Sequence, residues 1–319
     1  MNFVNKLKYL SYRIKYRYAR ELNLDRPVDV SLELAAACNL ACNYCYWANP
    51  KEIPFKKGFM QMDTAMLIIT DAAHLGVNSI KMNWKGESTL NPRFSEITKF
   101  AKAHASGSTF IDRLTNSNFM FKTEREDIFQ GLCNQTKVKV SFDSFIPEVM
   151  QEQRAKSDHS LVMKNIDYFY NHKDRKNTII SIQAVRTKLN KDEDIAFEVK
   201  RRWPEAEVSV RDMVGGRVDS DLTGLENRSR ENLGRQSCIQ AHARLVFNWS
   251  GDAMVCCVDL SEKLKMGNIH DKAIYEIFNS KEAKEFRKQL KNKSAFELDP
   301  CKTCSSWESY KGYKHPWGS

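Results

Sequence analysis

Apolar, strand-like runs alternate with helical stretches through the first two-thirds of the chain, and this alternation limits the folds that the chain can adopt. The strand-like runs are 28–36, 79–84, 109–114, 137–142, 178–185 and 207–213. The helical stretches between them are 62–75, 92–105, 124–132, 161–171 and 192–202. Such alternation predicts parallel βα units, arranged either as a doubly wound sheet or as an incomplete (βα)6 barrel. Ligands of both folds bind at the carboxyl ends of the strands, so we expect the functional side chains there.

Three closely spaced cysteines follow the first of these strands. Cys38, Cys42 and Cys45 form a C-x3-C-x2-C pattern. Thiolates in so tight a loop favour soft metals and iron–sulfur clusters. Three ligands on a [4Fe–4S] cube leave one iron open to a reactive ligand, whereas a structural zinc site is normally closed by four ligands. The pattern therefore favours a reactive iron–sulfur cluster over an unrelated zinc or redox loop.

Cysteine content and targeting signals bear on where the chain works. The 319 residues include nine cysteines, too few to staple a secreted domain of this size with disulfides. No apolar signal-peptide core follows Met1, and no later stretch reaches membrane-spanning length. We therefore expect a cytoplasmic, metal-binding protein without a transmembrane segment.

The net charge is +10, and the densest basic run lies near the amino terminus. Between Lys6 and Arg20, Lys and Arg residues are interleaved with Tyr9, Tyr12, Tyr16 and Tyr18. The favoured interpretation is a solvated amphipathic helix whose tyrosines pack on the body of the protein. The alternative is an arm, residues 1–26, that docks RNA, a membrane surface or an acidic partner.

A second group of cysteines occupies the last third of the chain. It comprises Cys238, Cys256, Cys257, Cys301 and Cys304. Residues 246–256 predict two short strands around a Ser-Gly-Asp turn, and helices are expected near 273–279 and 281–290. Four of these thiols suffice to close one iron–sulfur cluster, and tetrahedral zinc is the alternative.

The loop around Cys38, with Tyr44 at its aromatic position, resembles the cluster loop of radical S-adenosylmethionine (SAM) enzymes. Residues 238–304 resemble, in order, the auxiliary iron–sulfur domains of the SPASM and twitch types. The resemblance implies an α/β fold, with a partial (βα)6 barrel over 27–225 and a small α+β auxiliary domain over 226–319. Five cysteines are too few for the two clusters of a full SPASM domain, which implies the twitch form with one auxiliary [4Fe–4S] cluster. The implied auxiliary ligands are Cys238, Cys256, Cys301 and Cys304.

The same resemblance assigns one SAM contact to the end of the second strand. Gly86 and Glu87 match a G-G-E-P-like motif whose backbone and acid hold the amino group of SAM. Lys85 replaces the first glycine of that motif, and Ser88 replaces its proline, which weakens the match. From the residues alone, a Gly-Glu pair also fits a simple turn.

Further SAM contacts are implied at the third and fourth strands. Asn116 stands in a T-N-G-like position in which this chain has Ser117 instead of glycine. Ser141 and Arg154 match a serine and an arginine that contact SAM in the family, and Asp143 lies between them. Without the resemblance, these residues fit a turn, a buried strand-end serine and a surface arginine.

Two cysteines lie outside both ligand sets. Cys257 follows Cys256 on a strand, so its side chain points to the opposite face. It fits either a small buried hydrophobe or, as in radical SAM epimerases, a thiol that gives a hydrogen atom to a substrate radical. Cys133, at the end of a predicted helix, is expected in the core.

The resemblance implies a radical SAM oxidoreductase with two [4Fe–4S] clusters and SAM as cofactors. The expected reaction is a dehydrogenation of a small, hydroxylated, sugar- or aminocyclitol-like molecule, with the auxiliary cluster as electron acceptor. Epimerisation through Cys257, and peptide or nucleic-acid substrates, stay open, as does a non-enzymatic zinc or electron-transfer protein. A flavodoxin- or ferredoxin-type electron donor is implied. The segment 214–221, with Arg217, Asp219 and Asp221, fits either a lid over the site or a linker.

Overall fold

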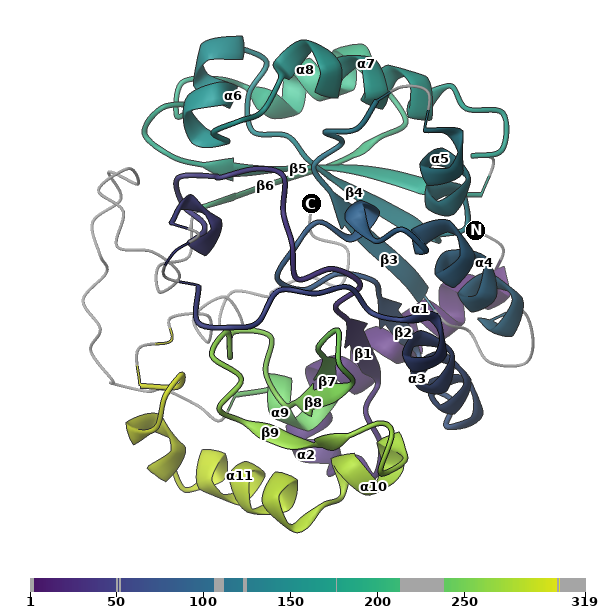
Figure 1. Ribbon diagram of the computed structural model, residues 1–319, viewed down its shortest axis with the longest axis vertical. Coiled ribbons are helices and arrows are strands. Elements are labelled where there is room, and N and C mark those ends of the chain that lie inside the picture. The colour runs from purple at the N-terminus through teal and green to yellow at the C-terminus, as the bar shows by residue number, and fades with distance from the viewer. Residues whose placement is uncertain are drawn as a thin grey trace.

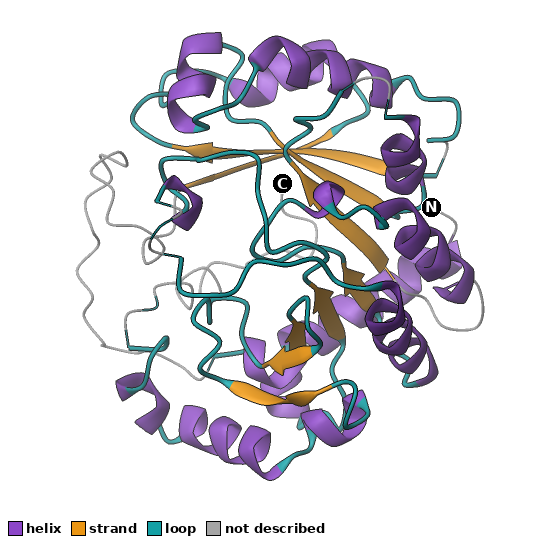
Figure 2. Cartoon of the chain, in the orientation of Figure 1, coloured by secondary structure: helices purple, strands orange, loops and turns teal. Residues whose placement is uncertain are grey.

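One sheet runs through the whole molecule. The computed structural model describes residues 3–49, 51, 53–105, 112–122, 125–175, 177–212, 238–302 and 304. The nine-stranded sheet has the order β6-β5-β4-β3-β2-β1-β7-β8-β9 (Figures 1 and 2). Its strands are β1 (Asp29–Leu32), β2 (Ser79–Lys81), β3 (Asp112–Ser117), β4 (Lys137–Ser141), β5 (Ile179–Arg186), β6 (Glu207–Asp212), β7 (Arg244–Phe247), β8 (Asp252–Met254) and β9 (Lys265–Asn268). The pairings from β6 to β1, and from β1 to β7, are all parallel, which confirms the open, partial-barrel arrangement.

Helices cover the outer face of the parallel strands (Figure 1). They are α3 (Met62–His74), α4 (Phe94–Ala105), α5 (Glu126–Cys133), α6 (Pro147–Gln153), α7 (His159–Tyr170) and α8 (Ile195–Arg202). Their buried apolar side chains join those of the strands in one core, to which Ile68, Ile97 and Ile166 belong. This layering gives each βα unit a common apolar interface.

The two faces of the sheet differ in polarity. Val30 of β1 pairs in register with Ile80 of β2 and Leu245 of β7, and all three belong to the core beneath the helices. The preceding register position holds Asp29, and its neighbours on β2 and β7 are also polar. Because side chains alternate between faces, the face away from these helices is the polar one.

The predicted strands and helices of the barrel are confirmed, with shifted ends. The first strand was predicted to run to residue 36, but β1 ends at Leu32. The reason is that the next residues pair with another segment: Met60 N–H donates to Leu34 O (3.0 Å) and Ala36 N–H donates to Gly58 O (2.8 Å). Helix α6 was not predicted, because seven residues are too few to show a helical period.

The carboxy-terminal segment continues the same sheet. Its elements are α9 (Gln240–Ala243), β7, β8, β9, α10 (Ile274–Phe278), α11 (Lys281–Lys291) and the 3-10 turn η4 (Ser294–Glu297). The expected pair of strands around the Ser-Gly-Asp turn is β7 and β8, which pair antiparallel. β7 also pairs with β1, so the segment that carries the second cysteine group is joined directly to the strand that precedes the first. The predicted boundary at 225/226 and the segment 214–221 lie outside the described residues.

Two helices, the 15-residue α1 (Phe3–Arg17) and the short α2 (Ala19–Leu22), precede the sheet. Tyr12 is buried and its hydroxyl donates to Asp29 Oδ2 (3.2 Å), while the Tyr16 hydroxyl donates to Gln240 Oε1 (3.1 Å). One face of α1 therefore packs on the body through its tyrosines, as the favoured interpretation of the basic run predicted. No helix among the described residues combines the length and apolar character that crossing a membrane requires.

Candidate functional site

The first cysteine group lies on the loop between β1 and α3. Backbone hydrogen bonds attach this loop to the segment after α6: Ala41 N–H donates to Ala155 O (2.9 Å), and Asn43 N–H donates to Gln153 O (3.0 Å). These contacts join residues more than a hundred positions apart, and they bring the loop to the carboxyl end of β4. The loop therefore lies at the edge of the sheet where ligands of such folds bind.

Asp143, which follows β4, organises the contacts around the loop. It is fully buried, and Arg154 reaches both of its oxygens: Nη2 donates to Oδ1 (2.9 Å) and Nε lies 2.8 Å from Oδ2. The Tyr44 hydroxyl donates to Oδ2 (2.5 Å), and Val185 N–H donates to Oδ1 (2.9 Å). Sequence analysis singled out Tyr44 and Arg154 and gave less weight to Asp143. The structure brings all three together and makes Asp143 the residue that joins the others.

Arg154 also reaches the cysteine loop itself. Its Nη1 donates to Cys42 Sγ (3.8 Å). Arg154 is only 7% exposed, so the alternative interpretation of this residue as a surface arginine is wrong. Burial raises the pKa of the Cys42 thiol to about 11, although Arg154 lowers it, and burial raises the pKa of Cys38 to about 12. Such thiols stay protonated at neutral pH unless a metal cation replaces the proton. The donor set therefore suits a thiolate-bound cluster, and metal loading is expected to release protons.

Within the described residues, no three Cys, His, Asp or Glu side chains already stand in a metal-binding arrangement. The loop cysteines are nevertheless electrostatic neighbours, since Cys42 and Cys45 both act on the pKa of Cys38.

Glu87 and Gly86 have structural partners within the chain. The Glu87 carboxylate is buried and accepts from Thr89 Oγ1 (2.7 Å) and from the N–H groups of Thr89 (3.2 Å) and Asn118 (2.7 Å). A Cβ at Gly86 would lie 2.2 Å from Ala35 O and 2.3 Å from Ala37 O. Glycine is thus required because the motif packs directly against the start of the cysteine loop.

The ends of β3 and β4 contribute the remaining predicted contacts. Asn118, just after β3, donates from Nδ2 to Asn39 Oδ1 (2.7 Å) and so ties the cysteine loop to this strand, a contact that sequence analysis missed. Asn116 is placed on β3, and its side chain lies outside the described part. Ser141 ends β4, is partly exposed, and pairs in register with Gln183 of β5 on the polar face of the sheet.

The carboxy-terminal cysteines gather against the core. Cys238, Cys256 and Cys301 all pack on it as partly buried residues. Burial, together with the nearby thiols of Cys304 and Cys301, raises the pKa of Cys238 to about 12. Cys304 N–H donates to Cys301 O (3.2 Å), as expected for a C-x2-C turn. Residues far apart in sequence thus supply neighbouring thiols, which suits one further cluster.

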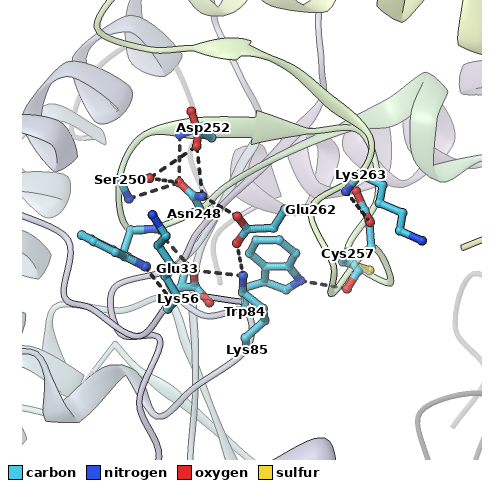
Figure 3. Close-up of polar contacts among 12 residues, drawn as sticks. Glu33, Lys56, Trp84, Lys85, Asn248, Ser250, Asp252, Cys257, Glu262 and Lys263 are labelled. Atoms are coloured by element: carbon cyan, nitrogen blue, oxygen red, sulfur yellow. Dashed lines mark hydrogen bonds and ion pairs between the residues drawn. The ribbon is translucent and has the colours of Figure 1, made fainter. Parts of the chain in front are cut away.

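Cys256 and Cys257 were predicted on a strand, but β8 ends at Met254 and both lie in the turn that follows. Cys257 acts on the pKa of Cys238 and Cys256, and it has further neighbours of its own. Its Sγ accepts from Arg244 Nη1 (3.6 Å), and Arg244 in turn donates from Nε to Asp29 Oδ1 (2.7 Å). Its carbonyl accepts from Trp84 Nε1 (2.8 Å), as Figure 3 shows. Cys133 lies in the core, as predicted, with Sγ 3.6 Å from His172 Nδ1.

A buried ionic cluster joins the turn after β2, which carries Lys85, to the carboxy-terminal segment (Figure 3). The side chain of Lys85 is fully buried, its Nζ pairs with Glu262 Oε1, and it lies 3.6 Å from Glu33 Oε2. The ammonium also lies 4.0 Å from the ring centroid of Trp84 and 4.2 Å from that of Phe55. Sequence analysis recorded Lys85 only as a departure from glycine. The departure itself was the available signal that this position has a role of its own.

Comparisons with known proteins agree with this arrangement. Residues 238–305 match the SPASM family, described as an iron–sulfur cluster-binding domain. Mycofactocin maturase MftC of Mycobacterium tuberculosis is 33% identical over 144 residues, which cover 45% of this chain and 34% of that protein. The S-adenosyl-L-methionine-dependent 2-deoxy-scyllo-inosamine dehydrogenase of Niallia circulans is 29% identical over 82 residues, 26% of this chain and 33% of that protein. The matches thus span about a third of the length of these curated relatives.

Solved structures share the fold over most of the chain. BtrN in complex with AdoMet and 2-DOIA has a TM-score of 0.57 at 17% identity, covering 87% of this chain and 92% of BtrN. Native anSMEcpe with bound AdoMet has a TM-score of 0.64 at 14% identity, covering 89% of this chain and 88% of that one. These likenesses show that the chain shares this fold over most of its length, and residues 238–305 match an iron–sulfur cluster-binding domain of the SPASM family.

Proposed function

We propose that this protein is a radical SAM enzyme that oxidises a small, hydroxylated substrate by two electrons. Cys38, Cys42 and Cys45 would hold the SAM-binding [4Fe–4S] cluster. The auxiliary [4Fe–4S] cluster would be held by Cys238, Cys256, Cys301 and Cys304. When bound, these groups supply a 5′-deoxyadenosyl radical that takes a hydrogen atom from a substrate C–H bond, and a second cluster able to accept the remaining electron.

The observation that carries the proposal is the Tyr44–Asp143–Arg154 arrangement around the cysteine loop. Asp143 fixes the guanidinium of Arg154 in one plane through two contacts, and Arg154 directs a third N–H at Cys42. The cysteine thiolates of a cluster and the carboxylate of SAM would bring negative charge, which a buried guanidinium stabilises. Arg154 therefore positions the loop and holds a cation beside the site. Ser141 and Asn116 would contact SAM from the adjoining strand ends.

The buried motif at the end of β2 has a positioning role in this proposal. Glu87 already accepts from Thr89 and Asn118, so it holds the ends of β2 and β3 together. Gly86 seats that turn against the cysteine loop. Backbone groups of this turn, rather than a free carboxylate, would then meet the amino group of SAM.

Dehydrogenation is favoured by the cysteines of the carboxyl end. The four proposed ligands close one cluster, which leaves it no open iron for substrate and suits electron acceptance. Two of the similar proteins have names in keeping with a small substrate: the 2-deoxy-scyllo-inosamine dehydrogenase, and BtrN in complex with AdoMet and 2-DOIA. Electrons for the reaction would come from a flavodoxin- or ferredoxin-type donor.

Metal analysis and SAM cleavage test the proposal. Anaerobically reconstituted protein should contain about eight irons with matching sulfide. Replacing Cys38, Cys42 and Cys45 together by Ala should remove about four irons and abolish 5′-deoxyadenosine formation. Tightly bound zinc without sulfide, or a triple variant that still cleaves SAM, would overturn the assignment.

The auxiliary cluster can be tested separately. Cys301→Ala should lose the second cluster and the oxidised product, yet still form some 5′-deoxyadenosine, because the loop of Cys38 stays intact. Full product formation by Cys301→Ala would contradict electron transfer to the auxiliary cluster.

A peptide substrate is the second candidate, and one comparison favours it. A PqqA peptide cyclase of Methylorubrum extorquens is 36% identical over 72 residues, and one solved structure in the comparison is anSMEcpe with bound AdoMet and the Cp18Cys peptide. Deuterium transfer from labelled candidates into 5′-deoxyadenosine separates the two classes. Transfer from a hydroxylated small molecule supports the dehydrogenase, and transfer only from peptides supports the alternative.

A further inference from the structure

The outward face of α1 carries an exposed apolar stripe. Leu7, Ile14 and Tyr18 are 51%, 48% and 46% exposed, and Leu22 of α2 is 51% exposed. Spacings of seven and four residues place Leu7, Ile14 and Tyr18 on one side of the helix. Among the described residues, eleven large hydrophobic residues are at least 39% exposed, and four of them fall within these first 22 positions. Such concentration is unusual for a surface with no partner.

The stripe is held rigidly, because the opposite face of α1 is attached to the body. Tyr12 is 7% exposed and bonds to Asp29, which also binds Arg244 (2.7 Å) and Lys81 (2.8 Å). Tyr16 bonds to Gln240, near the start of β7. The apolar side chains therefore cannot turn inward without breaking these buried contacts.

Basic residues flank the stripe. Lys15 and Arg17 are exposed on either side of Ile14, and the guanidinium of Arg17 lies 5.7 Å from the ring centroid of Tyr18. The sequence from residue 3 to residue 24 has six Lys or Arg residues, at positions 6, 8, 13, 15, 17 and 20, and Glu21 is its single acid. A stripe of aliphatic and aromatic side chains between cations fits an interface in which apolar tails lie beneath negative headgroups.

We propose that α1 docks this protein on an anionic lipid surface, with Leu7, Ile14 and Tyr18 entering the headgroup region and Lys15 and Arg17 contacting lipid phosphates. Nucleic acid is a poorer occupant, because aliphatic side chains such as Leu7 and Ile14 offer neither stacking planes nor hydrogen bonds to bases. An acidic protein would match the charge. It would not call for apolar residues along the whole helix, since protein interfaces concentrate their energy in a few central anchors.

Vesicle co-sedimentation of the full chain tests the proposal. Phosphatidylcholine vesicles that contain phosphatidylglycerol should bind the protein, and pure phosphatidylcholine vesicles should bind it far less. Ile14→Asp, and separately Lys15→Glu with Arg17→Glu, should each weaken binding by about tenfold or more. The loss of binding in the Lys15→Glu, Arg17→Glu variant should be smaller at high salt. Salt screens the attraction between these cations and the lipids, so the wild type also binds more weakly there.

Matched controls keep the test specific. Phe197→Asp changes an equally bulky side chain on α8 that is 61% exposed, and Lys284→Glu with Lys288→Glu makes the same charge change on exposed positions of α11. Both controls should bind like wild type, and circular dichroism should be unchanged in all variants.

Several outcomes would overturn the proposal. One is a wild type that ignores both kinds of vesicle, and another is equal binding to both. Loss of binding in the control variants would point to overall charge instead. Binding of an RNA oligonucleotide that the Lys15/Arg17 variant loses and Ile14→Asp keeps, without vesicle binding, would assign the surface to nucleic acid. Capture of an acidic protein without vesicle binding would assign it to a protein partner.

Discussion

Two buried ionic clusters tie cysteine-bearing segments to the sheet, and they differ in charge balance. Around the first cysteine loop, Asp143 meets Arg154, and both of its oxygens also accept from a neutral donor, Val185 N–H or the Tyr44 hydroxyl. At the carboxy-terminal segment, one ammonium faces two carboxylates, and Glu33 Oε1 has no hydrogen-bond partner among the described residues.

The unmatched carboxylate implies that the second cluster responds to pH. The Asp143 carboxylate is matched by a guanidinium and two further donors, so its cluster is a fixed support. Burial raises the pKa of Glu33 from its ordinary value of 4.5 to about 7, against the opposing effect of Lys85. The Lys85 cluster therefore changes its charge within the physiological range, because Glu33 titrates there.

The largest effect is expected for Arg154→Ala. The substitution leaves Asp143 buried without its cation, which should cost about 3–5 kcal/mol of unfolding free energy. SAM binding should be lost with it, because the loop of Cys42 loses its support. Denaturant unfolding of the metal-free protein and SAM titration of the reconstituted protein measure the two effects.

Arg201→Ala is the matched control, since its side chain is 68% exposed and pairs with Glu198 of the same helix. It should change stability by less than about 1 kcal/mol. An Arg154 variant as stable as this control would refute the supporting role of the Asp143 cluster.

A smaller effect is expected for Lys85→Met. The change removes the cation between Glu33 and Glu262, but Glu33 can take up a proton and Glu262 is partly exposed. We expect a loss of about 1–3 kcal/mol. The loss should grow as the pH rises, by at most about 1.4 kcal/mol per pH unit, because protonating Glu33 then becomes harder.

Unfolding measurements on either side of neutral pH test this expectation. Lys263→Met serves as the control, because Lys263 pairs with Asp299 and both side chains are more than half exposed. A Lys85→Met penalty that does not change with pH would show that Glu33 stays charged when its partner is removed.

The sequence predicted local structure better than these clusters. The βα alternation located β4 and α3 almost to the residue, because apolar periodicity is a local property. The contacts of Lys85 with Glu262 and of Tyr44 with Asp143 join residues 177 and 99 positions apart, and no local pattern records them. The same limit applies to β7, whose pairing with β1 depends on the path of the whole chain.

The candidate site was predictable where chemistry restricts the residue type. Cysteines are few and their spacing is informative, so both ligand sets could be named, and Arg154 could be named from its resemblance to the family. The role of Glu87 was harder to predict, because a buried carboxylate that caps a turn and a carboxylate that binds an ammonium look alike in sequence. Only the bonds to Thr89 and Asn118 point to the structural role.

Glu33→Gln should have a still smaller effect, visible only as a change in pH dependence. A carboxyl whose folded-state pKa is raised contributes stability below its unfolded pKa of 4.5 and loses that contribution as the pH rises to about 7. The wild type should therefore lose stability across this window, and Glu33→Gln should lose less. Thermal midpoints at several pH values measure the slope, with Glu96→Gln, a 60% exposed carboxyl, as the control. Equal slopes for Glu33→Gln and wild type would place the pKa of Glu33 outside the window.

Cys257→Ala should have the smallest effect of all, although the residue adjoins a proposed cluster ligand. The Cys257 thiol contacts Arg244, whose main partner is Asp29, so the arginine keeps its ion pair when the sulfur is removed. We expect a change of less than about 1 kcal/mol in stability, an unchanged iron content, and product formed at a rate near that of wild type. Cys256→Ala, one residue away, should lose the auxiliary cluster, which makes the pair a direct comparison of ligand and neighbour.

If the enzyme were an epimerase with Cys257 as hydrogen donor, the wild type would place solvent deuterium on a substrate carbon and Cys257→Ala would not. That result would move Cys257 into the reaction and replace dehydrogenation by epimerisation, while leaving the radical SAM assignment intact.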